Sequence, residues 1–277
     1  MRYKSPGALE MAVKEAAKTS PLDTNLAIRG FYYHRLLCRV FSEDKSSFVL
    51  KGGLGMLART IDARATRDAD LATYTLDIDE ALDELRRLAS KDLGDFVSFQ
   101  YEGVVPIRAE DEYREGYKVS FTAYLGMRAI QKISVDLVAD SIPCDNPDLV
   151  HPADRIEIEG LSSCDYPIYP VARAIADKVS GILETHDGRA SSRVKDLVDL
   201  VIYLRNDSFG KAELRDALKR EMAMRHLNLG GVFKVPEQWR HDYSPVYASL
   251  ARKARLPKGL CNLAGAEQLV SSCITYA

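Results

Sequence analysis

Three aspartates in the first half of the chain have the residue type and spacing of a metal site. Asp68 and Asp70 are two positions apart in a run, residues 68–73, that predicts a β-strand, so their carboxylates leave the same face. Asp136 lies on the polar side of a later predicted strand, residues 130–138, in which apolar and polar residues alternate. If the two strands pair, the three carboxylates meet. Carboxylate oxygens suit magnesium, and such a set predicts a site for two ions.

Two adjacent glycines mark a second candidate site. Gly52 and Gly53 stand where a β-prone run, residues 47–50, gives way to a helical pattern at residues 54–59. Bare backbone amides at such a junction, together with the positive end of the helix, can hold phosphate. Lys178, on a predicted helix of the second half, can neutralise further phosphate charge.

Together these residues point to nucleotidyl transfer from a nucleoside triphosphate. In that reaction one metal ion lowers the pKa of the attacking hydroxyl, another stabilises the pyrophosphate leaving group, and Asp136 takes the proton. Each feature alone also fits a plain structural role, such as a turn, a solvated strand end or a solvated helix face. Their order along the chain, with the glycine turn first, then the paired carboxylates and a distant third, favours the transferase.

The elements that must position these residues form a mixed first half and a helical second half. A helix begins at Pro6 behind the N-cap residue Ser5, and another covers residues 26–41. Further elements of the first half are strands at residues 96–101, 117–124 and 156–158 and a helix at residues 76–89. Helices of the second half are predicted at residues 171–184, 192–206, 211–225 and 244–254. We therefore expect two domains, residues 1–165 and residues 166–277.

The composition is that of an ordinary globular protein. The chain has 277 residues, 46% of them hydrophobic, with a formal net charge of -2 and a pI near 6.2. No overall positive field favours nucleic acid, so no DNA partner is expected and an RNA partner needs a local cationic patch. No apolar run reaches about 18 residues, and Glu10 and Glu15 interrupt the start, which predicts a cytoplasmic protein without a membrane segment. The five cysteines lack C-x-x-C spacing, so we expect reduced thiols and neither a disulfide framework nor a zinc site.

Several linked motifs resemble those of a known family. F-V-L-K-G-G at residues 48–53 and R-A-T-R-D-A-D-L at residues 64–71 resemble the F-V-L-K-G-G and R-x-T-x-D-I-D-L motifs of the AbiEii/AbiGii abortive-infection toxin nucleotidyltransferases, also called MenT-like toxins. A-D-K at residues 176–178 and S-R-V-K-D-L-V-D at residues 192–199 resemble that family's A-E-K and S-R-x-K-D-x-x-D pieces. Asp136 falls where the family's third carboxylate is expected.

The resemblance implies a fold and an activity. The fold is α+β, with a polymerase-β-like nucleotidyltransferase core, a mixed sheet with flanking helices, followed by a helical C-terminal domain that completes the active site. The activity is that of a toxin of a toxin–antitoxin system, which uses magnesium and a nucleoside triphosphate (NTP) and has a cognate antitoxin as its partner. Members of this family whose activity is understood add nucleotides to the acceptor end of transfer RNA (tRNA) and so halt translation.

The resemblance also carries roles to particular residues. Asp68 and Asp70 become metal ligands, and Asp136 becomes a ligand and the base. Gly52 and Gly53 line the nucleotide. The other carried-over residues are Lys178 on the phosphates, Asp196 fixing Lys178 or the nucleotide, and Lys51 and Arg64 at motif positions that bind the nucleotide.

Some alternatives remain open at this level. Asp140 competes with Asp136 for the register position of the third carboxylate, and Ala69 and Asp177 depart from the family's usual Ile and Glu. Lysines and arginines in residues 211–225 and 252–258 form either an acceptor-stem patch or a solvated face. The acceptor is RNA or, alternatively, a protein or small-molecule hydroxyl. A further alternative is a protein that binds nucleotide or antitoxin without catalysis.

Overall fold

The structure, a computed structural model, describes residues 3–43, 46–61, 63, 66, 68–107, 114–140, 144, 146–186, 188–227 and 232–274. The chain divides into two compact units. The first, which we call the sheet unit, contains the described residues of 1–61 and 65–169, and the second, the helical unit, contains those of 62–64 and 170–277. Each is described by itself.

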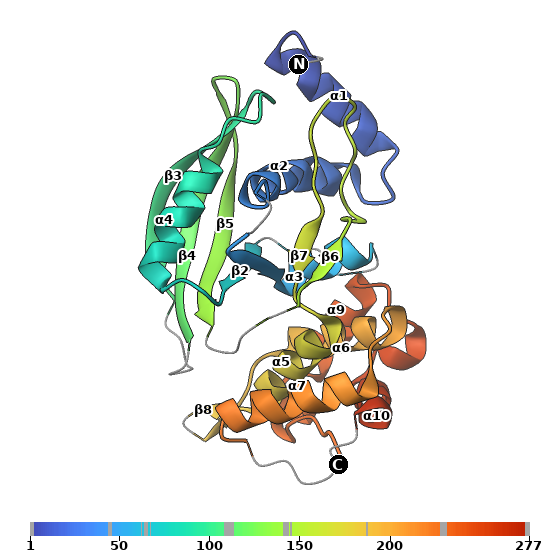
Figure 1. The fold of residues 1–277 in the computed structure, drawn as a ribbon. Helices are drawn as coiled ribbons and strands as arrows, with labels where there is room; N and C mark the ends of the chain where they lie inside the picture. Colours follow the sequence, from blue (N-terminus) through green and yellow to red (C-terminus); the bar gives the residue numbers. More distant parts are fainter. Residues whose placement is uncertain are drawn as a thin grey trace. The chain divides into compact units, whose positions relative to one another are not determined.

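Within the described residues, the sheet unit is built on a seven-stranded mixed sheet with the strand order β3-β4-β5-β2-β1-β7-β6 (Figure 1). The strands are β1 (Phe48–Lys51), β2 (Asp68–Thr73), β3 (Val97–Pro106), β4 (Arg114–Leu125), β5 (Arg128–Asp140), β6 (Asp148–Val150) and β7 (Tyr166–Ile168). Strands β2 and β5 are parallel, as are β1 and β7, and the other neighbours are antiparallel. The parallel neighbours β2 and β5 carry the three aspartates that the sequence singled out.

The helices of the sheet unit begin at well-formed caps. They are α1 (Pro6–Lys18), α2 (Thr24–Val40), α3 (Gly52–Arg59) and α4 (Ile78–Ala89). The Ser5 hydroxyl accepts from the Ala8 amide at 3.2 Å, and Asp77 and Glu80 form a reciprocal capping box at the start of α4. Helix α4 packs against α2 and against β3, β4 and β5, as Figure 1 shows. The predicted start of α1 is confirmed.

The two faces of β5 differ in burial as its alternation predicts. Ile133, Val135 and Leu137 are buried in the core, whereas Ser134 and Asp136 on the opposite side are partly exposed. The apolar face therefore anchors the strand and leaves the polar face to present side chains.

The helical unit packs around α6. Its elements are α5 (Val171–Leu183), β8 (Thr185–His186), β9 (Arg189–Ala190), α6 (Val194–Asn206), α7 (Lys211–Met224), α8 (Gln238–Asp242), α9 (Ser244–Lys253), η1 (Lys258–Leu260) and α10 (Leu263–Cys273). Helix α6 contacts α5, α9 and α10, and α5 also packs on α7. The fully buried Trp239 donates its indole N–H to the Ser191 carbonyl at 2.6 Å. Among the helices of the described chain, none has the length and apolar character needed to cross a bilayer.

The predicted elements and the observed ones differ in two instructive places. The strand predicted at residues 156–158 is wrong, because the Ile158 carbonyl instead accepts from the Leu161 amide in a turn and the segment joins no sheet. The division between units falls after Tyr169, not near residue 165, because β7 pairs with β1 and β6 and so belongs to the sheet.

Candidate active site

The three predicted aspartates lie on adjacent strands of the sheet unit. Asp70 on β2 is in direct register with Asp136 on β5, and Asp68 precedes Asp70 by two residues on the same face. The side chains of Asp68 and Asp136 are 42% and 27% exposed, so solvent and ligands reach them. In the register of β2 and β5, Asp136 and not Asp140 lies beside Asp70.

A lysine that the sequence did not single out joins this group. Lys118 on β4 is in register with Asp136, and its Nζ lies 2.9 Å from Asp136 Oδ1 and 3.8 Å from Asp68 Oδ1. The hydrogen bond and charge of Asp136, with smaller contributions from Asp68 and Asp70, raise the pKa of Lys118. Within the described residues, no group of three or more His, Cys, Asp or Glu side chains is placed so that it could hold a metal ion. The ammonium of Lys118 occupies the space between two of the carboxylates.

Gly52 lies against this carboxylate group for a geometric reason. It has a φ of +60°, and a Cβ at this position would lie 1.9 Å from Asp70 Oδ2. A Cβ on Gly53 would lie 2.8 Å from the Thr66 side chain. Only glycine therefore lets the start of α3 approach Asp70 this closely. The N-cap residue of α3, Lys51, offers its first amides no side-chain acceptor.

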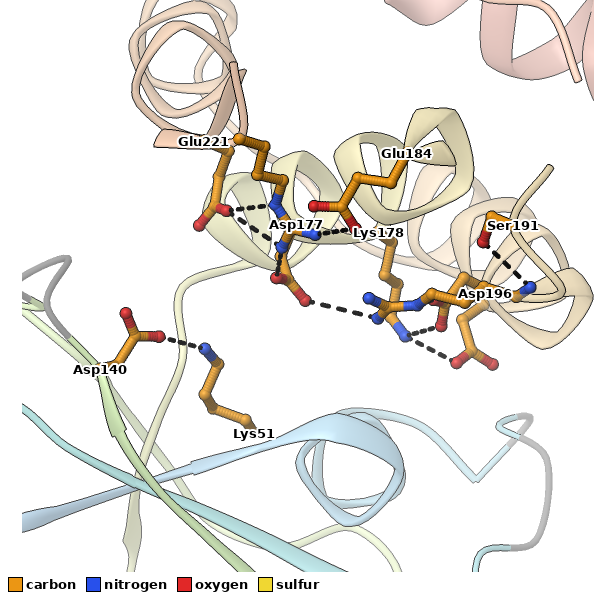
Figure 2. A network of polar contacts seen from close by, with 11 residues as sticks. Lys51, Asp140, Asp177, Lys178, Glu184, Ser191, Asp196 and Glu221 are labelled. Atoms are coloured by element: carbon orange, nitrogen blue, oxygen red, sulfur yellow. Dashed lines mark hydrogen bonds and ion pairs between the residues drawn. The ribbon is translucent and has the colours of Figure 1, made fainter. Parts of the chain in front are cut away.

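Lys51 and Asp140 pair with each other within the sheet unit (Figure 2). Lys51 Nζ lies 3.1 Å from Asp140 Oδ2 and 4.1 Å from the centroid of the Tyr169 ring, a cation–π contact. Lys51 is thus engaged by two partners in the structure, although its motif position predicts nucleotide binding. Arg64, the other residue predicted from its motif position, lies outside the described residues.

In the helical unit, Lys178 on α5 is buried between two aspartates of α6. Its Nζ donates to Asp196 Oδ1 at 2.9 Å and to Asp199 Oδ2 at 2.8 Å, and the residue is 7% exposed (Figure 2). Burial favours neutral lysine, but the two carboxylates outweigh it and raise the pKa of Lys178. Burial likewise opposes ionisation of Asp196, yet Lys178 and Arg193 lower the pKa of that carboxyl. Lys178, Asp196 and Asp199 therefore form a charged group that their mutual hydrogen bonds hold in place.

Two arginines extend this group. Arg193 Nε lies 2.5 Å from Asp196 Oδ2, and its guanidinium packs against Gly181, where a Cβ would lie 2.4 Å from Arg193 Nη1. Arg225 is fully buried as a side chain and pairs with three carboxylates, Asp177 at 2.5 Å, Glu184 at 2.8 Å and Glu221 at 3.3 Å. We call these eight residues the ionic cluster: Asp177, Lys178, Glu184, Arg193, Asp196, Asp199, Glu221 and Arg225 (Figure 2).

The sequence contained signals for some of the residues that had no predicted role. Asp199 follows Asp196 by three positions, so both face the same side of α6. Lys118 has no motif, and only the antiparallel register of β4 on β5 reveals it. Glu221 lies four residues before Arg225, a local helical spacing, but only tertiary packing brings Asp177 and Glu184 to the same guanidinium.

A comparison with known protein families identifies the family of this chain. The sequence profile of the nucleotidyl transferase AbiEii toxin family, from type IV toxin–antitoxin systems, matches residues 35–260. The chain belongs to this family. The resemblance inferred from the motifs is confirmed, and this AbiEii family member is a nucleotidyltransferase. Among curated protein sequences, none matches the chain.

Solved structures show the fold of this AbiEii family member. MenT4, a nucleotidyltransferase toxin from Mycobacterium tuberculosis H37Rv, is similar with a TM-score of 0.55 and 15% identity, over 97% of this chain and 88% of that one. JHP933 from Helicobacter pylori gives a TM-score of 0.44 and 14% identity, over 86% and 89% of the two chains. The predicted α+β fold with a polymerase-β-like nucleotidyltransferase core is confirmed.

Proposed function

We propose that this AbiEii family member transfers a nucleotide from an NTP to an RNA acceptor, the 3′ end of tRNA, and thereby blocks translation. The observation that carries the proposal is the register of Asp70 with Asp136 beside Gly52. This arrangement places carboxylates next to the start of α3, where no side chain caps the first backbone amides. The site thus combines features that bind a cation and a phosphate.

The residues present fit magnesium. Asp68, Asp70 and Asp136 offer only carboxylate oxygens, the ligands that this hard cation prefers. Lys118 Nζ already lies between Asp68 and Asp136, which supports a role of this space in holding positive charge. Magnesium, when bound, activates the attacking hydroxyl and stabilises the leaving pyrophosphate. We propose Asp68, Asp70 and Asp136 as its ligands, with two ions at the site.

The chain's own residues perform the remaining tasks in this proposal. Asp136 takes the proton from the acceptor hydroxyl. The amides that follow Gly52 and Gly53 bind the triphosphate, and Lys51 and Arg64 are the further nucleotide-binding residues of the proposal. Lys178 neutralises phosphate charge, and Asp196 holds the Lys178 ammonium in position.

A cationic surface of the helical unit supports an RNA acceptor. Lys211, Arg215 and Lys219 follow one another at four-residue spacing and are exposed on α7, so they share one helix face. The other exposed cations of residues 211–225 and 252–258 are Arg220, Arg252, Lys253, Arg255 and Lys258. Within the described chain none of these eight side chains forms an ion pair. Unpaired cations attract the phosphate backbone and release its counterions on binding.

A transfer assay tests the proposed reaction. Purified protein is incubated with magnesium, each labelled NTP in turn, total tRNA and cell protein. We expect label on tRNA, with one NTP preferred, and no label from the Asp70→Asn variant. The matched control is Asp83→Asn, which changes an exposed carboxylate on α4 and keeps full transfer. Label on protein alone would refute the RNA acceptor, and no label on any acceptor would refute catalysis in favour of a binding protein.

A second assay tests the RNA surface separately from the chemistry. Changing Lys211, Arg215 and Lys219 together to Gln removes three phosphate contacts. A plot of the logarithm of the tRNA association constant against the logarithm of the salt concentration should then become shallower by roughly 2–3 in slope. Lys14→Gln with Lys18→Gln, in the paired cations of α1, is the control. An unchanged slope in the triple variant would place the RNA elsewhere.

Partner and location follow from the same proposal. The family implies an antitoxin partner, since its members are toxins of type IV toxin–antitoxin systems. An enzyme that acts on tRNA works in the cytoplasm, which we propose as its location. Coexpression of the neighbouring gene product with the toxin tests the partner, because a cognate antitoxin restores growth.

A further inference from the structure

A chain of buried polar side chains crosses the core of the sheet unit and has no part in the proposed transfer. Asp154 Oδ2 lies 3.2 Å from His34 Nε2, and His34 Nδ1 lies 3.1 Å from the Tyr166 hydroxyl. The Tyr166 hydroxyl in turn lies 3.8 Å from Cys38 Sγ. All four residues are buried. Burying polar groups costs free energy unless they hydrogen-bond with one another. The buried thiol at the end of this hydrogen-bonded chain is therefore a candidate for chemistry.

A second thiol meets the first. Cys38 and Cys164 line the same cavity, and hydrogen bonding with Cys164 is the largest influence on the pKa of Cys38; we call these two residues the thiol pair. Two arginines fix the segment that carries Cys164: Arg35 Nη1 donates to the Ser162 carbonyl and Arg155 Nη1 donates to the Cys164 carbonyl, each at 2.6 Å. The thiol pair is therefore held by contacts on both sides of Cys164.

The thiol pair also borders open space. A cavity of about 770 Å³ in the sheet unit is lined by both cysteines, by Cys144 and by the serines at 162 and 163. This volume admits a small oxidant or electrophile to the buried Cys38 and to the partly exposed Cys164. All five cysteines lie in the described chain, and none is in a disulfide.

The surroundings favour a thiolate at Cys38. Hydrogen bonding from Cys164 is the largest influence, Arg35 and Arg155 add positive charge, and together they outweigh burial and lower the pKa of Cys38 to about 5. The same pairing raises the pKa of Cys164, which keeps that thiol protonated. Arg35 and Arg155 each retain a buried Nη2 without a hydrogen-bond partner among the described residues. One thiolate beside one thiol is the arrangement of a nucleophile and a resolving cysteine.

We propose that Cys38 and Cys164 form a peroxide-reactive dithiol that closes to a disulfide. The Cys38 thiolate attacks one oxygen of hydrogen peroxide, the O–O bond breaks, and hydroxide leaves as Cys38 becomes a sulfenic acid. The Cys164 thiol then attacks the Cys38 sulfur, the S–S bond forms, and the sulfenic oxygen leaves as water. The hydroxide takes up the proton that Cys38 had lost. Two thiols are thus oxidised while one peroxide is reduced to two waters.

The bond would tie α2 to the segment before β7. Residues 38 and 164 are far apart in sequence, so the cross-link closes a long loop and restricts the unfolded chain. The oxidised sheet unit is expected to unfold at a midpoint higher by roughly 5–10 °C.

Peptide mapping under non-reducing conditions tests the proposal. Full-length protein is treated with one equivalent of hydrogen peroxide, and the remaining thiols are alkylated before digestion. We expect one linked peptide that joins Cys38 to Cys164, a mass lower by two hydrogen atoms, and free thiols at the other three cysteines. A protein that keeps all its thiols, or links a different pair first, overturns the proposal.

Single variants separate the two roles. In Cys164→Ser the reaction stops at the Cys38 sulfenic acid, which dimedone traps, whereas Cys38→Ser blocks oxidation at both positions. Cys273→Ser, which changes an exposed thiol of the helical unit, leaves the linked peptide unchanged. If dimedone labels Cys164 in Cys38→Ser as fast as it labels Cys38 in Cys164→Ser, the assignment of Cys38 as the nucleophile is wrong. Should a variant not fold, the wild-type peptide map still decides whether the pair closes.

Discussion

The sheet unit and the helical unit differ in how far their ion pairs are buried. In the sheet unit, Asp68 and Asp136 stay partly exposed and share one partner, the half-exposed Lys118. In the helical unit, Lys178 and Arg225 are buried, and each is paired with two or more carboxylates. One group of charges is open to exchange and the other is closed.

The difference teaches which group can change partners. An exposed ion pair is worth little, so an incoming cation displaces Lys118 at small cost. A buried pair is expensive to break because the remaining charge has no solvent. We therefore expect substitutions in the sheet unit's carboxylates to alter chemistry with the fold intact, and substitutions in the ionic cluster to alter the fold first.

The largest expected effect is on transfer in Asp70→Asn. This change removes a proposed metal ligand but keeps the side-chain shape against Gly52, so transfer should fall by about 1,000-fold or more, the loss of several kcal/mol of charge stabilisation. Thermal unfolding should stay within about 2 °C of wild type, because Asp70 is partly exposed. A large loss of stability would contradict the comparison, since it would make the carboxylates part of the scaffold.

In the ionic cluster, Arg225→Met should lower the stability of the fold, whereas Asp70→Asn in the sheet unit lowers transfer and leaves stability unchanged. Three carboxylates lose a fully buried partner, so the free energy of unfolding of the helical unit should fall by about 3–5 kcal/mol. Trp239, the only tryptophan of the chain, is buried in this unit, and its fluorescence in a urea titration measures the change.

Arg220→Met is the matched control for that experiment. Arg220 lies on the same helix, α7, but is exposed and has no ion pair within the described residues. Its loss should change stability by less than about 0.5 kcal/mol. Equal effects of the two variants would show that the ionic cluster does not hold the unit together.

An intermediate effect is expected at the glycine that joins fold and chemistry. Gly52→Ala adds a Cβ that overlaps the Asp70 carboxylate and forces alanine to a φ of +60°. Misplacing a ligand by about 1 Å costs roughly 100-fold in rate, so transfer should fall by about that factor. Gly188→Ala also imposes a positive φ, +74°, but meets no atom within 4 Å, so it isolates backbone strain and should keep full transfer. Equal losses in both variants would refute the contact explanation.

Much of the sheet unit could be predicted because its rules are local. The alternation in β5 and the N-cap at Ser5 each fix one element, and the two-residue spacing of Asp68 and Asp70 fixes their shared face. The register of Asp70 with Asp136 is not local, and only the order of the motifs pointed to it.

The contacts that the sequence could not supply depend on partners far along the chain. Lys118 reaches Asp136 through strand pairing, and Arg225 collects carboxylates from two helices and a loop. The thiol pair joins α2 to a loop that has no motif at all. The family resemblance gives Lys178 a contact with phosphate, yet burial and two aspartates decide its surroundings in the structure.

The smallest and sharpest effect is expected at Lys118, where the open site already holds an internal cation. If Lys118 competes with a divalent ion for Asp68 and Asp136, Lys118→Met should bind Mn²⁺ about 5-fold more tightly in the absence of nucleotide, a gain of roughly 1 kcal/mol. Manganese electron paramagnetic resonance measures the free ion directly and needs no turnover. Lys132→Met removes a neighbouring exposed cation from β5 and should leave the affinity unchanged. Weaker binding by Lys118→Met would instead make Lys118 a support of the carboxylates, and the sheet unit would then resemble the closed cluster of the helical unit.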